Sequence, residues 1–283
     1  MRDIAEYALQ AALDAGAAYA DVRVQEVDTE EVSVRNGVLE TAEQATSAGV
    51  GIRVLVDGAW GFAATSELEG NKPAAAARLA VDVGRASAKV KRRDVVLAPA
   101  EAESGNYETP YREDPFAVGL SEKVDLLVAA SEAMRTDERI MAASAALGLR
   151  RERTVFVSSE GSLLTQTILQ TGTGISATAA DDHDAQHRSY PGGHGGQHAC
   201  AGFELVRDLA LVQSAPRVAE EALALLTAPA CPAGTMSIVL DGSQVALAEH
   251  SEFAQRPSYG LAASPGRKIG SEHDLVGIHE LLQ

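Results

Sequence analysis

The chain has 283 residues, of which 46% are hydrophobic and 23% charged. This composition is typical of a folded globular protein with one large or two modest domains. Its 24 Lys and Arg residues against 40 Asp and Glu residues give a formal net charge of −16. Such a charge repels polyanions, and the one basic cluster, residues 89–93, is typical of a solvated helix end, so we expect no nucleic-acid partner.

Neither the amino terminus nor the interior predicts export or membrane insertion. Met1 leads straight into a charged helical pattern without the apolar core of a signal peptide. The longest uncharged run, residues 222–240, contains Pro229 and Pro232, unlike a helix that crosses a bilayer. The chain has two cysteines, too few for a disulfide framework, which fits a reducing compartment. We therefore expect a cytoplasmic protein without a membrane partner.

The first ninety residues predict a helix, an antiparallel meander and a second helix. Residues 3–15 and 71–89 carry apolar side chains at helical spacing. Between them, residues 19–65 alternate between apolar and polar side chains, as in half-buried strands. The dipeptides Asn36-Gly37 and Asp57-Gly58 interrupt this run and predict type I′ hairpin turns, because both central residues of such a turn need a positive φ.

The next part of the chain predicts a second unit of the same kind. After a loop-like connection over residues 94–114, residues 121–135 predict a helix, and strand spacing returns over residues 140–149, 153–158 and 163–179. The glycine and valine spacing of the first meander is echoed in the second, although two unrelated hairpins could share it. Two helix-plus-meander units predict an α+β fold with helices on one face of the strands.

The polar, glycine-rich stretch from Asp181 to Cys200 predicts a surface loop. Imidazoles are good zinc ligands, but Pro191 and the flanking glycines argue against a helix that presents several histidines to one metal. We interpret the stretch as a surface loop, with a metal-binding module as the alternative. It holds four histidines: His183, His187, His194 and His198.

Residues 203–226 return to helical spacing, with a predicted interruption at Pro216. A short strand is predicted over residues 236–240, after a domain boundary near Ala228. No Gly-x-Ser-x-Gly elbow or phosphate-binding loop is present in the sequence. The sequence therefore predicts neither a serine hydrolase nor a nucleotide-binding enzyme.

Several segments together resemble the TldD/PmbA metallopeptidase family over residues 1 to about 247. They are the opening helix, residues 19–24, 34–40, 49–63 and 158–161, Arg188-Ser-Tyr-Pro-Gly-Gly-His-Gly-Gly196, and Thr235-Met-Ser-Ile-Val-Leu-Asp-Gly-Ser-Gln-Val-Ala-Leu247. The resemblance implies an amino-terminal domain over residues 1–227, with subunits of about 1–93 and 115–227. Residues 228–283 would then be the truncated or diverged start of a β-rich, metallopeptidase carboxyl-terminal domain.

The resemblance also implies a function. Members of the family are cytoplasmic peptidases that pair as homo- or heterodimers, enclose a cavity and cut short or unfolded peptides with one zinc ion. Their ligands come from a His-Glu-x-x-x-His segment directly after the Ser-Gln-Val-Ala-Leu strand, and from a cysteine nearer the carboxyl end. In such a motif two imidazoles hold the metal and the glutamate is the general base.

This chain departs from that motif. His250 occupies the first histidine position, but Ser251 replaces the glutamate and Gln255 replaces the second histidine. His250 is therefore the single candidate metal ligand, no catalytic residue is assigned, and zinc is not expected to bind to this chain alone. We interpret the chain as a truncated family member whose residues beyond Leu247 form an altered tail, such as a frameshift in the coding sequence would give.

Two functions remain open from the sequence. The first is a zinc metallopeptidase with an incomplete site, weakly active or inactive alone, whose substrate is a peptide or an unfolded polypeptide. The alternative is a non-catalytic partner subunit or peptide-binding module of a TldD/PmbA-type complex.

Overall fold

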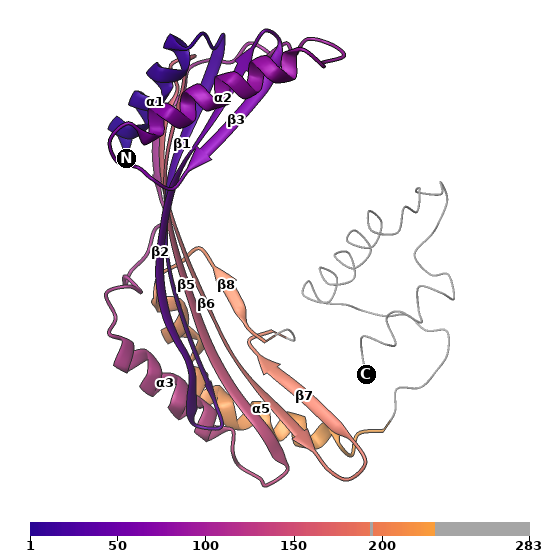
Figure 1. The fold of residues 1–283 in the computed structure, drawn as a ribbon. Helices are drawn as coiled ribbons and strands as arrows, with labels where there is room; N and C mark the ends of the chain where they lie inside the picture. Colours follow the sequence, from indigo (N-terminus) through magenta and orange to yellow (C-terminus); the bar gives the residue numbers. More distant parts are fainter. Residues whose placement is uncertain (193–194, 230–283) are drawn as a thin grey trace. The chain divides into compact units, whose positions relative to one another are not determined.

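A computed structural model describes residues 1–192 and 195–229 of the chain. Within it, Met1–Ala228 forms one compact unit of helices and long antiparallel strands (Figure 1). The predicted α+β class is confirmed. The strand predicted over residues 236–240 lies outside the described residues, and the domain boundaries stay a prediction. In the described part of the chain, no helix is long and apolar enough to cross a membrane.

The first part of the chain forms a helix, a three-stranded meander and a second helix, as its spacing predicts. The elements are α1 (Arg2–Asp14), β1 (Tyr19–Arg35), β2 (Val38–Val56), β3 (Ala59–Thr65) and α2 (Lys72–Ala88). The φ angles are 50° and 77° at Asn36 and Gly37, and 48° and 72° at Asp57 and Gly58. Both turns therefore have the positive φ angles of type I′, and both turn predictions are confirmed.

The second part repeats this order with additions. Its elements are β4 (Ser104–Glu108), α3 (Leu120–Ala133), β5 (Ile140–Ser158), β6 (Leu163–Ala180), β7 (Ala185–Tyr190), β8 (Gln197–Ala199), α4 (Glu204–Leu209) and α5 (Leu211–Leu225). Helix α3 and strands β5 and β6 are the helix and the meander that the sequence predicts there.

The two meanders join edge to edge into one sheet with the order β3-β2-β1-β5-β6-β4. The join is the antiparallel pairing of β1 with β5, which runs from Asp21 opposite Ser158 to Arg35 opposite Ser144. The outer edge of β6 is shared by β4, β8 and β7, which pair with it one after another along its length. The sheet therefore runs unbroken from the first meander into the second.

The two predicted loops, over residues 94–114 and 181–200, are wrong in part, because they contain β4, β7 and β8. These segments carry no clear strand-like alternation of apolar side chains. They are strands because they satisfy the N–H and C=O groups along the outer edge of β6.

The predicted helix break at Pro216 is also wrong. The interruption lies at Ala210, whose φ of 48° separates α4 from α5, and Pro216 lies inside α5. A proline inside a helix removes one backbone hydrogen bond. Helix α5 continues past it because its apolar face is anchored in the core from both sides of the proline, through Leu211, Ala215, Val218, Ala219 and Ala222.

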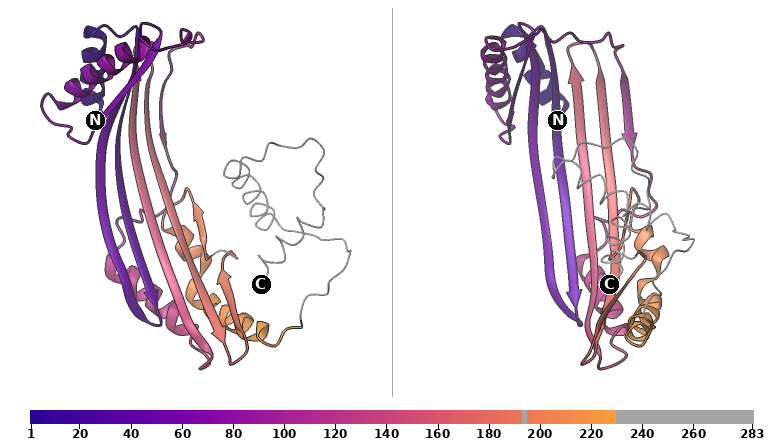
Figure 2. Two further views of the ribbon diagram at one scale, coloured as in Figure 1. Left: turned by 45° about the vertical axis from the view of Figure 1, so that its right-hand side comes forward. Right: turned by 90° about the vertical axis from the view of Figure 1, so that its right-hand side faces the viewer.

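The helices pack on one face of the sheet, in two groups at opposite ends of the long strands (Figure 2). Helices α1 and α2 pack with Val22 and Val24 of β1, whereas α3 and α5 pack with Val32 and Val34 of the same strand. Alternate residues of a strand share a face, so these four valines lie on one side of the sheet. We call this side the helix-covered face.

A charged band divides the helix-covered face between the two apolar clusters. Glu26 and Asp28 continue the alternation of the buried valines, and Arg153 of the neighbouring strand contacts both carboxylates, with 2.6 Å between its Nη2 and Oδ2 of Asp28. Next to them Arg151 bonds Asp114 in the connection before α3. The helix-covered face therefore has two apolar cores with ion pairs between them.

A buried ion pair fixes α3 to the sheet at the border of this band. Nζ of Lys123 lies 2.6 Å from Oε1 of Glu30, and the two side chains are 1% and 2% exposed. Gln44 of β2 donates to the other carboxylate oxygen of Glu30 at 2.8 Å. Both oxygens thus have partners, which is the condition under which a buried charge is tolerated.

We expect Lys123→Met to lower the free energy of unfolding by about 3–5 kcal/mol, because it leaves the Glu30 carboxylate buried without its counter-charge. Urea unfolding followed by circular dichroism measures this. The matched control is Lys72→Met, whose pair with Glu67 is exposed on both sides and whose loss is expected to cost less than about 1 kcal/mol. Equal losses in the two variants would contradict the expectation.

Candidate functional site

The face of the sheet opposite the helices is open, and it carries the two hollows of the described residues that we consider as candidate sites. In β1 the residues that alternate with the buried valines, such as Arg23, Gln25 and Glu31, point to this side. The pairing with β5 brings Phe156 beside Arg23 and Thr154 beside Gln25 on the same face. The central strands therefore form one accessible surface of polar and aromatic side chains.

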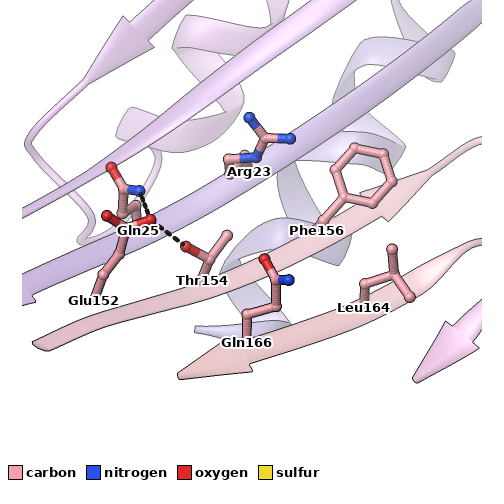
Figure 3. A pocket seen from close by; sticks show the side chains of 7 residues that line it. All are labelled: Arg23, Gln25, Glu152, Thr154, Phe156, Leu164 and Gln166. Atoms are coloured by element: carbon pink, nitrogen blue, oxygen red, sulfur yellow. Dashed lines mark hydrogen bonds between the residues drawn. The ribbon is translucent and has the colours of Figure 1, made fainter. Parts of the chain in front are cut away.

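The first hollow has a volume of about 460 Å³ and lies over β1, β5 and β6 (Figure 3). Its floor is a cross-strand layer, since Thr154 of β5 has Gln25 of β1 on one side and Gln166 of β6 on the other. The side chains that line it are Arg23, Gln25, Glu152, Thr154, Phe156, Leu164 and Gln166.

Hydrogen bonds and charge order the side chains of the first hollow. Gln25 donates to Oε1 of Glu152 at 2.6 Å, and Nη2 of Arg150 lies 2.7 Å from the other oxygen of that carboxylate. The guanidinium of Arg23 stacks over the ring of Phe156 at 5.6 Å from its centre. Glu152 is thus neutralised, while Arg23 still presents hydrogen-bond donors. The hydroxyl of Thr154 also donates to Oε1 of Glu152, at 3.4 Å, but this carboxylate is already bonded to Gln25 and Arg150 (Figure 3). The arrangement can bind a polar, extended ligand.

An aromatic group extends this face toward the end of the sheet that carries α1 and α2. The rings of Tyr19 and Trp60 meet edge to face with their centres 6.0 Å apart, and Arg53 lies over Trp60 while it bonds Asp21 at 2.7 Å. Burial and the neighbouring Asp21 carboxylate raise the pKa of Tyr19 to about 12. Phe62 of β3 is 59% exposed beside this group.

The second hollow, of about 320 Å³, lies on the same open face, at the end of the sheet whose other face packs against α3 and α5. Its floor is bare, because Gly148 and Gly172 are cross-strand neighbours and no atom lies within 4 Å of where a Cβ of Gly148 would be. Glu31 of β1 also lines this hollow. Its lining further includes part of residues 195–198, which we call the glycine segment.

Part of the glycine segment lies over β6, because Gly172 and Gly174 of that strand have no side chains on this face. A Cβ on Gly172 would collide with the ring of His198, and a Cβ on Gly174 would collide with the backbone of Gly195 and Gly196. The glycines of the loop and of the strand therefore allow two backbones to approach closely. This is a structural reason for the glycine-rich stretch.

The structure describes three of the four histidines of residues 181–200 and does not bring them together at one site. His187 contacts the hydroxyl of Thr178 at 3.2 Å, His198 lies over Gly172, and the backbone N–H of His183 bonds Asp181. In the described ranges, no group of three His, Cys, Asp or Glu side chains could hold a metal ion. His194 and the candidate ligand His250 lie outside those ranges, so the structure assigns no position to either.

The sequence reading missed several residues of this surface and of the charged band. A signal for the band is present, since Glu26, Asp28 and Glu30 stand in register with the inward valines of β1. Such a run predicts counter-charges on a neighbouring strand. The hollows have no comparable signal, because Arg23, Gln25 and Gln166 resemble any exposed strand residues.

We expect Gly174→Ala to displace the glycine segment, because the added methyl group would occupy its backbone. Hydrogen exchange of β8, which pairs with residues 171–173, should lose protection, and stability should fall by about 1–3 kcal/mol. Gly148→Ala is the control, since its methyl group would enter open space. Unchanged protection of β8 in the Gly174→Ala variant would contradict the close approach.

Two family domains match this chain. Residues 20–85 match the domain described as PmbA/TldA metallopeptidase domain 1, and residues 113–227 match the PmbA/TldA metallopeptidase central domain. Together they cover more than half of the chain. The part of the structure that carries both hollows therefore consists of these two domains.

Relatives of known name agree with this match. Metalloprotease MJ0996 of Methanocaldococcus jannaschii is 23% identical over 266 residues, which are 91% of this chain and 57% of the relative. A metalloprotease of Methanothermobacter thermautotrophicus is 26% identical over 223 residues, 79% of this chain and 46% of the relative. The chain spans about half the length of the curated relatives it matches.

Solved structures share the fold. The TM0727 protein of Thermotoga maritima superposes with a TM-score of 0.64 at 21% identity, over 82% of this chain and 50% of that one. TldE of Thermococcus kodakarensis gives a TM-score of 0.56 at 17% identity, over 78% of this chain and 47% of that one.

Proposed function

Because the chain belongs to the TldD/PmbA family, we propose that it is a metallopeptidase-family protein whose own zinc site is incomplete. Its relatives are named metalloproteases. The proposal rests on one observation: at the position of the family's His-Glu-x-x-x-His segment, this chain has His250 followed by Ser251 and Gln255. We infer that it is weakly active or inactive on peptides by itself.

At the position of the family's motif, the residues of this chain do not fit a zinc ion. One imidazole at position 250 cannot replace the two that the motif uses, and Ser251 cannot act as the general base that the glutamate supplies. The described residues contain no other suitable donor group. We therefore derive no catalytic step that passes through a metal.

We propose the cytoplasm as its location and a peptide or unfolded polypeptide as the ligand. A second role is that of a non-catalytic subunit, which pairs with a complete TldD/PmbA-type chain or with its own copy. It is supported by the polar hollow around Gln25 and Gln166, which can bind an extended chain without cutting it. In this role the neighbouring subunit would supply the metal.

The test of the incomplete site is to measure zinc and peptide cleavage on the same purified chain. We expect well below one zinc ion per chain by mass spectrometry, and no chelator-sensitive cleavage of a fluorogenic peptide library, because one imidazole alone binds zinc weakly. His250→Ala is the matched variant and should leave both measurements unchanged. One zinc ion per chain that His250→Ala removes, together with chelator-sensitive cleavage, would overturn the proposal.

A further inference from the structure

Strand β2 has a long edge without a partner in the described chain. Strand β3 pairs with Val50–Val56 of β2 and leaves residues 38–49 free on that side (Figure 2, right). Residues 42–47 are all exposed. The free stretch has neither a lysine nor a proline, two residues with which proteins usually protect exposed strand edges, and its β-bulge at Glu40 leaves residues 41–49 regular. Its backbone is thus available to another strand.

The hydrogen bonds between neighbouring strands determine which residues of β2 direct their N–H and C=O groups outward. The N–H of Ser159 bonds the carbonyl of Ala20, so the even-numbered residues of β1 face β5 and the odd-numbered residues face β2. The β2 partners of those odd residues, such as Glu43 opposite Glu31, face β1 in turn. The residues between them, from Ala42 to Ala48, direct their N–H and C=O groups outward.

The charge beside this edge favours a basic partner. Glu31 and Glu43 are directly opposite each other on the open face, and both are exposed. Like charges in this position destabilise a strand pair, and no ion pair of the described chain includes either carboxylate. In an added antiparallel strand, the residue opposite Glu43 would form a non-hydrogen-bonded pair, in which side chains lie closest. A lysine or arginine there would neutralise the repulsion.

We propose that the free edge of β2, residues 38–49, binds an extended basic segment of another polypeptide as an added antiparallel strand. Backbone bonds to Ala42, Gln44 and Thr46 provide the binding, and Glu43 with Glu31 selects cationic side chains on the open face. A second copy of this chain is a poorer occupant, because each copy carries a net charge of −16 and the same two carboxylates. The binding does not depend on the metallopeptidase role proposed above.

The test uses a fluorescent decapeptide of alternating Lys and Thr, with binding to the full chain followed by anisotropy. When its lysines face Glu43, the threonine N–H groups point to β2. N-methylation of the threonines should therefore weaken binding by about tenfold or more, whereas N-methylation of the lysines should have little effect. A peptide with Glu in place of Lys should not bind measurably. Equal binding by the two methylated peptides, or no binding of the Lys and Thr peptide, overturns the proposal.

Variants of the chain provide the complementary test. Glu43→Lys should weaken binding about tenfold, whereas Glu69→Lys, the same change at an exposed residue after the end of β3 and outside residues 38–49, should stay within about twofold. Ala42→Pro removes one outward N–H on an edge strand that tolerates proline and should also weaken binding. Weakening by Glu69→Lys as large as by Glu43→Lys would show general charge attraction and overturn the proposal. So would a dimer in size-exclusion chromatography that Ala42→Pro dissociates, since a second copy would then be the occupant.

Discussion

The pairing of β1 with β5 is the constraint on which the rest of the structure depends. It joins two helix-and-meander units into one sheet, and it sets the register from Asp21 to Arg35. A slip by one residue would turn every inward valine of β1 to the open face. The two apolar cores, the charged band and both hollows all take their positions from this one ladder.

The charged band separates two apolar environments along β1 on the helix-covered face. Val22 and Val24 lie under α1 and α2, Val32 and Val34 lie under α3 and α5, and between them the strand crosses a stretch where acidic residues meet Arg153. Ion pairs there are partly exposed and contribute little stability. The two ends are therefore held together by backbone pairing, and the buried Lys123–Glu30 pair anchors one helix at the border.

The sequence allows much of the fold to be predicted, because its strongest signals are local. Alternation and the Asn36-Gly37 and Asp57-Gly58 dipeptides specify strands and turns through φ preferences that act within a few residues. Strands β7 and β8 escape prediction because they carry no clear alternation of apolar side chains, although β7 follows β6 directly in a hairpin. Strand β4 escapes prediction because its partner, the edge of β6, lies far away in the sequence. The candidate surface escapes for the same reason: Arg23 and Phe156 become neighbours only through the register of β1 and β5. The histidines that the structure describes show the converse, since nearness in sequence does not bring three metal ligands together in space.

The two margins of the sheet differ in a way that limits assembly. Beyond β6, the edge is divided among three short strands with separate connections, and short strands offer too few consecutive backbone groups to template another chain. Beyond β2, one continuous stretch is free. In the described chain this is the longest free stretch of sheet edge, so the addition of a strand is directed to the β2 side of the sheet.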